Sequence, residues 1–242
     1  MGASFSKVIN VSLKERVIRE LEKSILSGDL QPGDRLPPER ELAAAMGISR
    51  SLINVCILEL ESRGFVRIVP RHGTFVNDYK KHGTPQMLLS LMNFESDRMD
   101  WSLFDDMMDT RRLLEYECTR LAVQNASDND IAGMYEALAM MEDLKNAERF
   151  NEGNFLFHHI LTVASGNALY AMIFNSFGNA IRFFIKHFFS TEERRIQSLR
   201  SHRALLEAIQ QGDMPPALEA IRCTLDTGIA GLSDIFKHRI PE

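Results

Sequence analysis

Two polar side chains that can bind metals or anions, Asn154 and His158, lie four residues apart in a stretch with helical periodicity. Residues at i and i+4 share one face of a helix, so both side chains point the same way. Neutral imidazole is a common metal ligand, and imidazole and amide groups also form directional hydrogen bonds to anions. A lone histidine on an apolar helix is more often a core residue, so this pair alone leaves the use open.

A second group of candidate residues surrounds the start of a predicted helix. Ser49 is a good N-cap, and Arg50 and Ser51 follow it in the first turn. The N-terminus of a helix favours phosphate, and residues there read base edges when the helix enters the major groove of DNA. Arginine contacts guanine through two hydrogen bonds or pairs with phosphate. These residues are therefore candidates for contact with duplex DNA.

The surrounding pattern predicts a winged helix-turn-helix. A capping-box spacing at Ser12 opens a first helix that ends at Gly28, and a prolyl pair precedes a second, short helix over residues 39–46. The helix that begins after Ser49 ends at Gly64. Two β-type runs, residues 65–68 and 74–76, then predict a hairpin.

From Met87 onward the periodicity predicts helices and no strand. Helices are expected over 102–124, from 127 to about 144, and over 151–165, 168–189 and 191–211, with a last helix whose first turn holds Pro215 and Pro216. The polar segment that contains Gly83 and Pro85 predicts a linker. The expected fold class is mainly α. A winged helix-turn-helix with a small β-hairpin wing occupies residues 1–78, a linker 79–86 and an all-helical antiparallel bundle 87–242.

Length and composition agree with a two-domain plan. The 242 residues exceed the usual length of one domain, and 45% of them are hydrophobic. No stretch is long and apolar enough for a membrane span or a secretory signal, so we expect a cytoplasmic protein with no membrane partner. Cys56, Cys118 and Cys223 lack a CxxC pair and are expected to be reduced core thiols. Residues 1–78 carry 11 Lys and Arg against 10 Asp and Glu, and a balance so near neutral permits DNA binding without establishing it.

The run PGDRLPPERELAAAMGISRSLINVCILELESRGFVRIVPRHGTFV, from Pro32 to Val76, resembles the N-terminal domain of the GntR family of transcription regulators. The second half is similar to the FadR-type ligand domain of that family, the FCD domain. Its motifs are RRLLE at 111–115, NFLFH at 154–158, SGN at 165–167, and His202 ahead of AIQQGD at 208–213. The resemblance implies a regulator, a repressor in many relatives, that binds operator DNA as a homodimer under the control of a small metabolite.

The resemblance also implies which residues contact DNA. Arg40 and Arg50 are expected to touch the duplex, and the wing tip Arg71-His72-Gly73 is expected to reach the minor groove or the backbone. Ser49, Ser51 and Asn54 complete the predicted reading surface. Many relatives carry a second arginine where this chain has Asn54, and asparagine can pair with adenine. We therefore expect an operator that differs from the usual one of the family.

Apolar residues share the outer face of this helix. Leu52, Val55 and Leu58 are expected to face outward. Apolar groups there either touch a thymine methyl group or pack against the partner domain, and the sequence leaves both open.

The resemblance places His202 opposite Asn154 and His158 in the bundle core, where many family members hold a divalent metal with an Asp and three His. This chain departs twice, because Asn154 replaces the Asp and Thr224 stands where the last His would fall. Loss of a carboxylate and an imidazole lowers affinity for zinc or nickel. A metal held by Asn154, His158 and His202 is therefore the secondary prediction.

Without a metal, the same residues can bind an anion directly. Arg111 offers a planar fork of donors, and Asn154, His158, His202 and Thr224 offer directional hydrogen bonds. The leading expectation is a small carboxylate effector. The phenylalanine-rich run over 181–189 is expected to pack within the bundle or across a dimer, and the alternative is an aromatic wall for a larger apolar effector such as a fatty acid.

Two other functions compete with this one. A metal-dependent hydrolase fused to a DNA-binding module would use the histidine cluster, but no carboxylate lies in the matched constellation to act as general base. We therefore expect no enzyme activity. An effector-independent DNA-binding protein with a vestigial sensor would differ from a regulator because no metabolite would change its operator affinity.

Overall fold

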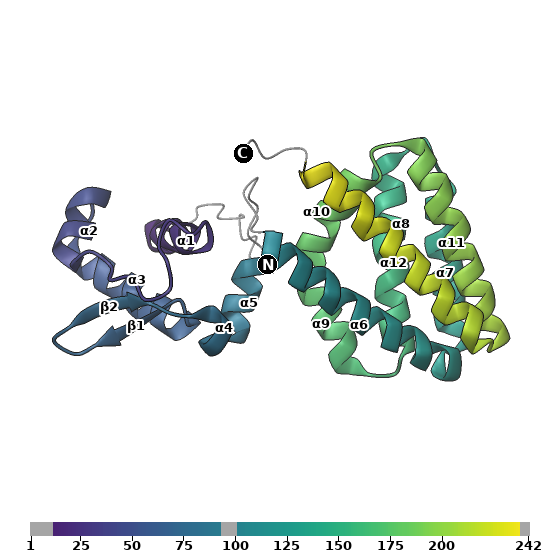
Figure 1. Cartoon of the computed structure of the whole chain (residues 1–242), viewed down its shortest axis with the longest axis horizontal. Helices are drawn as coiled ribbons and strands as arrows, with labels where there is room; N and C mark the ends of the chain where they lie inside the picture. Colours follow the sequence, from purple (N-terminus) through teal and green to yellow (C-terminus); the bar gives the residue numbers. More distant parts are fainter. Residues whose placement is uncertain (1–11, 93–100, 238–242) are drawn as a thin grey trace, which may run out of the picture. The chain divides into compact units, whose positions relative to one another are not determined.

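The computed structural model describes residues 12–92 and 101–237. Contacts divide the chain into two compact units, Met1–Arg98 and Met99–Glu242. Twelve helices and one two-stranded hairpin form in the described residues (Figure 1), so the expected mainly α fold class is confirmed.

The first unit begins with α1 (Leu13–Leu26), α2 (Glu39–Met46) and α3 (Arg50–Arg63). The side chains of Ser12 and Ser49 accept hydrogen bonds from backbone amides of the first turns of α1 and α3, each at 3.2 Å, so both predicted N-caps form. The left-handed conformation of Gly64, at a φ of 92°, ends α3 at little cost for a glycine. The core below these helices is apolar and includes Ile18, Ile53, Ile57, Leu60 and Phe65.

The wing follows α3 as an antiparallel hairpin of β1 (Val66–Val69) and β2 (Gly73–Val76). The loop before α2 extends this sheet, because the amide of Leu36 donates to the carbonyl of Thr74 at 2.9 Å and Arg35 bridges to Phe75. The pairing fixes the position of α2 relative to the wing.

The segment expected to be a linker, residues 79–86, is instead largely helical and docked. It contains α4 (Tyr79–His82) and the start of α5 (Pro85–Met92). The hydroxyl of Thr84 donates to the carbonyl of Arg63 and accepts from the amide of Met87, whose side chain is fully buried. In this segment Gly83 therefore ends α4, Thr84 and Pro85 start α5, and the division between the units falls after Arg98.

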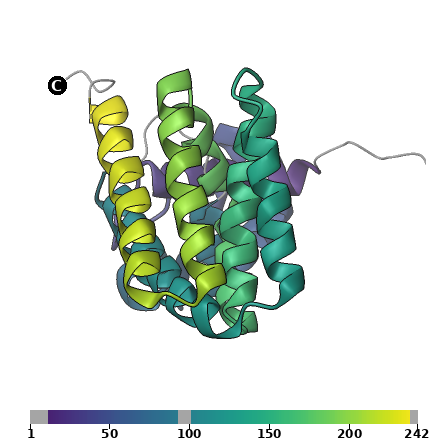
Figure 2. The ribbon, with the colours of Figure 1, turned by 90° about the vertical axis from the view of Figure 1, so that its right-hand side faces the viewer.

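The second unit is the helical bundle. It consists of α6 (Trp101–Asn125), α7 (Asp128–Met141), α8 (Ala147–Ala164), α9 (Ala168–Ser176), α10 (Gly178–Phe188), α11 (Glu192–Gln211) and α12 (Met214–Lys237). Figure 2 shows its long helices side by side, with α7 packed on α8 and α11 packed on α12. The single helix expected over 168–189 is two helices, because the chain bends by 61° between α9 and α10.

Two further expectations concern membranes and cysteines. Over the described ranges, no single helix has the length and apolar character to cross a membrane, although two bent helix pairs, α2 with α3 and α9 with α10, meet the length and composition criteria together. Cys56 and Cys118 are buried, but Cys223 is exposed on α12. The expected burial of all three thiols is therefore wrong for Cys223, since Ile221 and Leu225 occupy the buried face.

Candidate functional site

The predicted DNA-contact residues form an exposed polar surface on α2, α3 and the wing. The exposed members are Arg40, Ser49, Arg50, Ser51, Asn54, Arg71 and His72, and Gly73 is half-buried. Val55 and Leu58 are exposed beside them, as expected, at 46% and 50% of their full area, while Leu52 is half-buried. This surface combines cationic, amide and hydroxyl donors, which are the groups that contact phosphate and base edges.

No sequence pattern predicts the role of Glu39, which holds two residues of this surface. Its carboxylate accepts a hydrogen bond from Arg50 Nε at 3.1 Å and another from Asn54 Nδ2 at 3.0 Å. The bonds from Asn54 and Arg50 lower the pKa of the Glu39 carboxyl below its ordinary value. Both side chains are therefore oriented on the free protein, and the amide of Asn54 turns its nitrogen toward Glu39.

The wing tip has an unusual backbone. In the described part of the chain, Arg71 is the one non-glycine residue with a positive φ, at 64°. The amide of His72 donates to the carbonyl of Val69 at 3.0 Å and closes the turn. The left-handed region costs an arginine free energy that a glycine would not lose, so a cation at this tip is consistent with a functional constraint.

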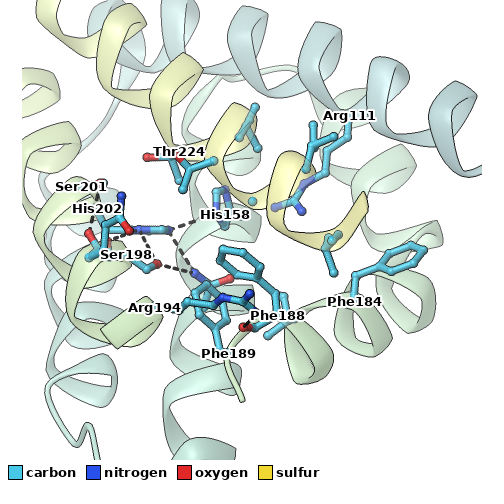
Figure 3. A pocket seen from close by; sticks show the side chains of 18 residues that line it. Arg111, His158, Phe184, Phe188, Phe189, Arg194, Ser198, Ser201, His202 and Thr224 are labelled. Atoms are coloured by element: carbon cyan, nitrogen blue, oxygen red, sulfur yellow. Dashed lines mark hydrogen bonds between the residues drawn. The ribbon is translucent and has the colours of Figure 1, made fainter. Parts of the chain in front are cut away.

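The five predicted effector residues line one cavity in the bundle (Figure 3). They are Arg111 from α6, Asn154 and His158 from α8, His202 from α11 and Thr224 from α12. The cavity offers about 50 Å³ to water-sized molecules. One water needs about 10–15 Å³ by this measure, so there is room for a small ligand.

A buried carboxylate, Glu115, supports two of these residues from behind. Arg111 Nε donates to Glu115 Oε1 at 2.5 Å, and His158 Nδ1 donates to Glu115 Oε2. Burial raises the pKa of this carboxyl, but the charges of Arg111 and His158 outweigh that effect and hold the pKa at about 2. Glu115 is therefore ionised. It follows Arg111 by four residues, a helical ion-pair spacing that was the available sequence signal.

Hydrogen-bond geometry places the protons on the two histidines. His202 Nδ1 lies 2.7 Å from the carbonyl oxygen of Ser198, which can only accept, so this nitrogen carries a hydrogen. Burial and the adjacent His158 lower the pKa of His202 to about 3, so its Nε2 holds a lone pair at neutral pH. That lone pair accepts from Asn154 Nδ2 at 3.2 Å and from His158 Nε2 at 3.1 Å. Both ring nitrogens of His158 then carry protons, and its charge pairs with Glu115.

This arrangement is a poor donor set for zinc or nickel. Asn154 directs its amide N–H toward His202, and the hydroxyl of Thr224 donates to the carbonyl of Ala220 at 2.8 Å. In the residues that the structure describes, no three His, Cys, Asp or Glu side chains come together to hold a metal. The predicted ligands Asn154, His158 and His202 do meet, but as a hydrogen-bonded cluster without a carboxylate among them.

The cavity wall combines cationic and aromatic side chains. Its 18 lining residues include two arginines, Arg111 and Arg194, and two histidines, and none is Asp or Glu. Arg111 and His158 are two cations against one buried carboxylate, so that cluster carries one net positive charge, and Arg194 adds another. Phe184, Phe188 and Phe189 from the phenylalanine-rich run complete the wall.

Sequence comparisons assign both units. The model for bacterial regulatory proteins of the gntR family matches residues 13–76, and the model for the FCD domain matches residues 106–227. The chain belongs to the GntR family. Members of the family with an FCD domain are transcription regulators that bind DNA and effector metabolites, and they are not enzymes. This assignment argues against the hydrolase considered from the sequence.

Individual relatives agree with the assignment. The fatty acid metabolism regulator protein of Shewanella sp. (strain MR-7) is 28% identical over 184 residues, which cover 76% of this chain and 74% of that protein. The galactonate operon transcriptional repressor of Escherichia coli (strain K12) is 26% identical over 226 residues, covering 91% and 97%. The structure of Lar, which controls expression of the Listeria monocytogenes agr system, matches with a TM-score of 0.60 at 19% identity, covers 93% of this chain and 98% of that one, and supports the fold.

Proposed function

We propose that this GntR regulator binds its operator through α2, α3 and the wing, and that a small carboxylate bound beside Arg111 changes its operator affinity. The observation that carries the carboxylate is the charge of the cavity, where Arg111, His158 and Arg194 line the wall and no acidic side chain does. An anion placed there meets charge-assisted hydrogen bonds, which are stronger than neutral ones.

Arg111 is the main anchor in this proposal. Its Nε is bound to Glu115, which orients the guanidinium and leaves the terminal nitrogens for a ligand. Asn154, His202 and Thr224 line the same space, but they donate their hydrogen bonds to His202, Ser198 and Ala220. In this proposal they shape the site around the ligand, and Arg111 supplies the free donors. The aromatic wall favours a second candidate, a longer apolar acid, but a cavity of about 50 Å³ suits a short acid better than an acyl chain.

Binding of the effector does not require a metal in this proposal. Glu115, the carboxylate next to His158, is bonded to His158 Nδ1 and Arg111 Nε and does not line the cavity, so no carboxylate is left there to hold a bridging ion. Calorimetry before and after treatment with a chelator should give the same carboxylate affinity. A bound equivalent of zinc or nickel whose removal abolishes effector binding would contradict this point.

The protein acts in the cytoplasm as a homodimer on a two-fold symmetric operator, because one winged helix reads only a half-site. Arg40, Arg50 and the wing tip supply contacts to the duplex, Ser49 and Ser51 supply hydroxyl groups at the start of α3, and Asn54 favours adenine at one position. Sedimentation with and without operator DNA tests the stoichiometry. A monomer that binds one asymmetric site with full affinity would refute it.

The central experiment measures operator affinity in the presence of a carboxylate panel of acetate, butyrate, lactate, succinate, gluconate and citrate. Arg111→Ala should abolish the response to the active acid and leave the affinity for free operator unchanged. Arg112→Ala is the matched control, because Arg112 pairs with Asp109 and Asp226 and does not line the cavity. A full response in Arg111→Ala would place the effector elsewhere.

A further inference from the structure

Arg194 differs from the other cations of the cavity because it has no acidic partner. In the two described ranges of the chain, its contacts are a hydrogen bond from Nη1 to the carbonyl of Phe188 at 3.1 Å and a cation–π contact with the Phe188 ring at 5.0 Å. Arg111, in contrast, is paired with Glu115. The Phe188 contacts fix the guanidinium at the cavity wall and leave its other nitrogens available.

Arg194 begins a polar stripe along α11. Arg194, Gln197, Ser198, Ser201 and His202 all line the cavity, and their spacing of three or four residues places them on one face of the helix. The eight residue steps from Arg194 to His202 span about 12 Å of helix axis, at about 1.5 Å per step. In the view of Figure 3, Arg111 and Arg194 lie on different sides of His158. The two arginines therefore stand at separate places around the cavity, Arg111 on α6 and Arg194 at the start of the α11 stripe.

We propose that the effector carries two anionic groups, one bound by Arg111 and the other by Arg194. This inference rests on the carboxylate site proposed above and specifies its ligand as a short dicarboxylate. A single carboxylate neutralises the one net positive charge of the cluster of Arg111, His158 and Glu115, and leaves Arg194 unpaired in the cavity. A second anionic group removes that unpaired charge, and the small volume of the cavity limits the spacer to a few carbons.

The test is calorimetry on the full-length protein with butyrate, gluconate, succinate, glutarate and adipate. At least one of the three dicarboxylates should bind about tenfold more tightly than butyrate, since a second charge-assisted contact of moderate strength gives that ratio. Arg194→Gln should remove this advantage and change butyrate affinity by less than about twofold. Arg200→Gln is the control, because Arg200 is exposed on the same helix and does not line the cavity.

Each outcome bears on one of the two proposals. Equal affinity of the native protein for butyrate and all three dicarboxylates, or unchanged dicarboxylate affinity in Arg194→Gln, overturns the two-anion ligand and leaves the Arg111 site standing. Binding of gluconate that is tighter than that of butyrate and is unchanged in Arg194→Gln also overturns the two-anion ligand, because the α11 stripe would then recognise hydroxyl groups. If no acid binds, or if the affinity for the acid is unchanged in Arg111→Ala, the carboxylate site itself is contradicted.

Discussion

Replacing Glu115 by glutamine tests the buried charge cluster directly. The variant keeps the shape of the side chain and removes the negative charge that Arg111 Nε contacts at 2.5 Å and that His158 also contacts. Removing one member of a buried ion pair costs about 3–5 kcal/mol, because it leaves an uncompensated charge. We therefore expect the free energy of unfolding to fall by about 3 kcal/mol.

The matched control lies two residues further along the same helix. Glu117 pairs with Arg120 at 2.7 Å, but both side chains are more than a third exposed, so Glu117→Gln should cost less than about 1 kcal/mol. Urea unfolding followed by the helical circular dichroism signal, at pH 7 and one protein concentration, measures both variants. Equal losses in Glu115→Gln and Glu117→Gln would refute the argument, because burial of the ionised carboxylate would then have no energetic consequence.

Three further predictions concern residues other than Glu115 and Glu117. Folding lowers the pKa of His202 from about 6.5 to about 3, so below pH 6.5 the unfolded chain binds a proton that the folded chain does not. The urea concentration at the unfolding midpoint should therefore decrease as the pH is lowered from 6.5 to 4. In His202→Gln the midpoint should depend less on pH, and a decrease as steep as that of the native protein would contradict the role of His202. Glu39→Gln should raise affinity for random DNA and reduce preference for the operator in anisotropy titrations, whereas Glu41→Gln, exposed on the same helix, should leave the preference unchanged. Arg71→Gly should relieve the positive φ without lowering the unfolding midpoint, and should weaken binding to all DNA with a salt slope lower by about 1; an unchanged slope would remove the wing tip from the interface.

Local signals in the sequence were sufficient for the elements of the DNA-binding unit. N-caps such as Ser12 and Ser49, and the glycines Gly47 and Gly64 that end helices, act on backbone groups only a few residues away. The bend at Phe177 could not be predicted in the same way. The run over 168–189 lacks proline, and its cluster of weak helix formers, Asn175, Ser176, Gly178 and Asn179, is compatible with either a continuous helix or a break, so packing within the bundle sets the bend.

The contacts within the candidate sites join residues that are far apart along the chain, and a local sequence pattern does not predict such contacts. Glu39 reaches Arg50 and Asn54 across 11 and 15 residues, after the chain has turned between two helices. Glu115 sits in a long helix where a glutamate usually faces solvent, and its burial follows from the position of α8. The five effector residues were predicted because the family resemblance supplied their convergence. Arg194 is outside those motifs and becomes notable only beside the cavity.

The docking of α5 has a practical consequence for chimeras of this protein. Met87 is fully buried, and Thr84 covers the carbonyl of Arg63 at the end of α3. A DNA-binding unit truncated after Asp78 lacks the buried methionine, whose burial is worth about 1.5–3 kcal/mol, and its Arg63 carbonyl loses the hydrogen bond from Thr84. A chimera that joins this DNA-binding unit to another ligand-binding domain should therefore keep the chain through Met92. A fusion joined directly after the wing should unfold at a lower temperature than one joined after α5.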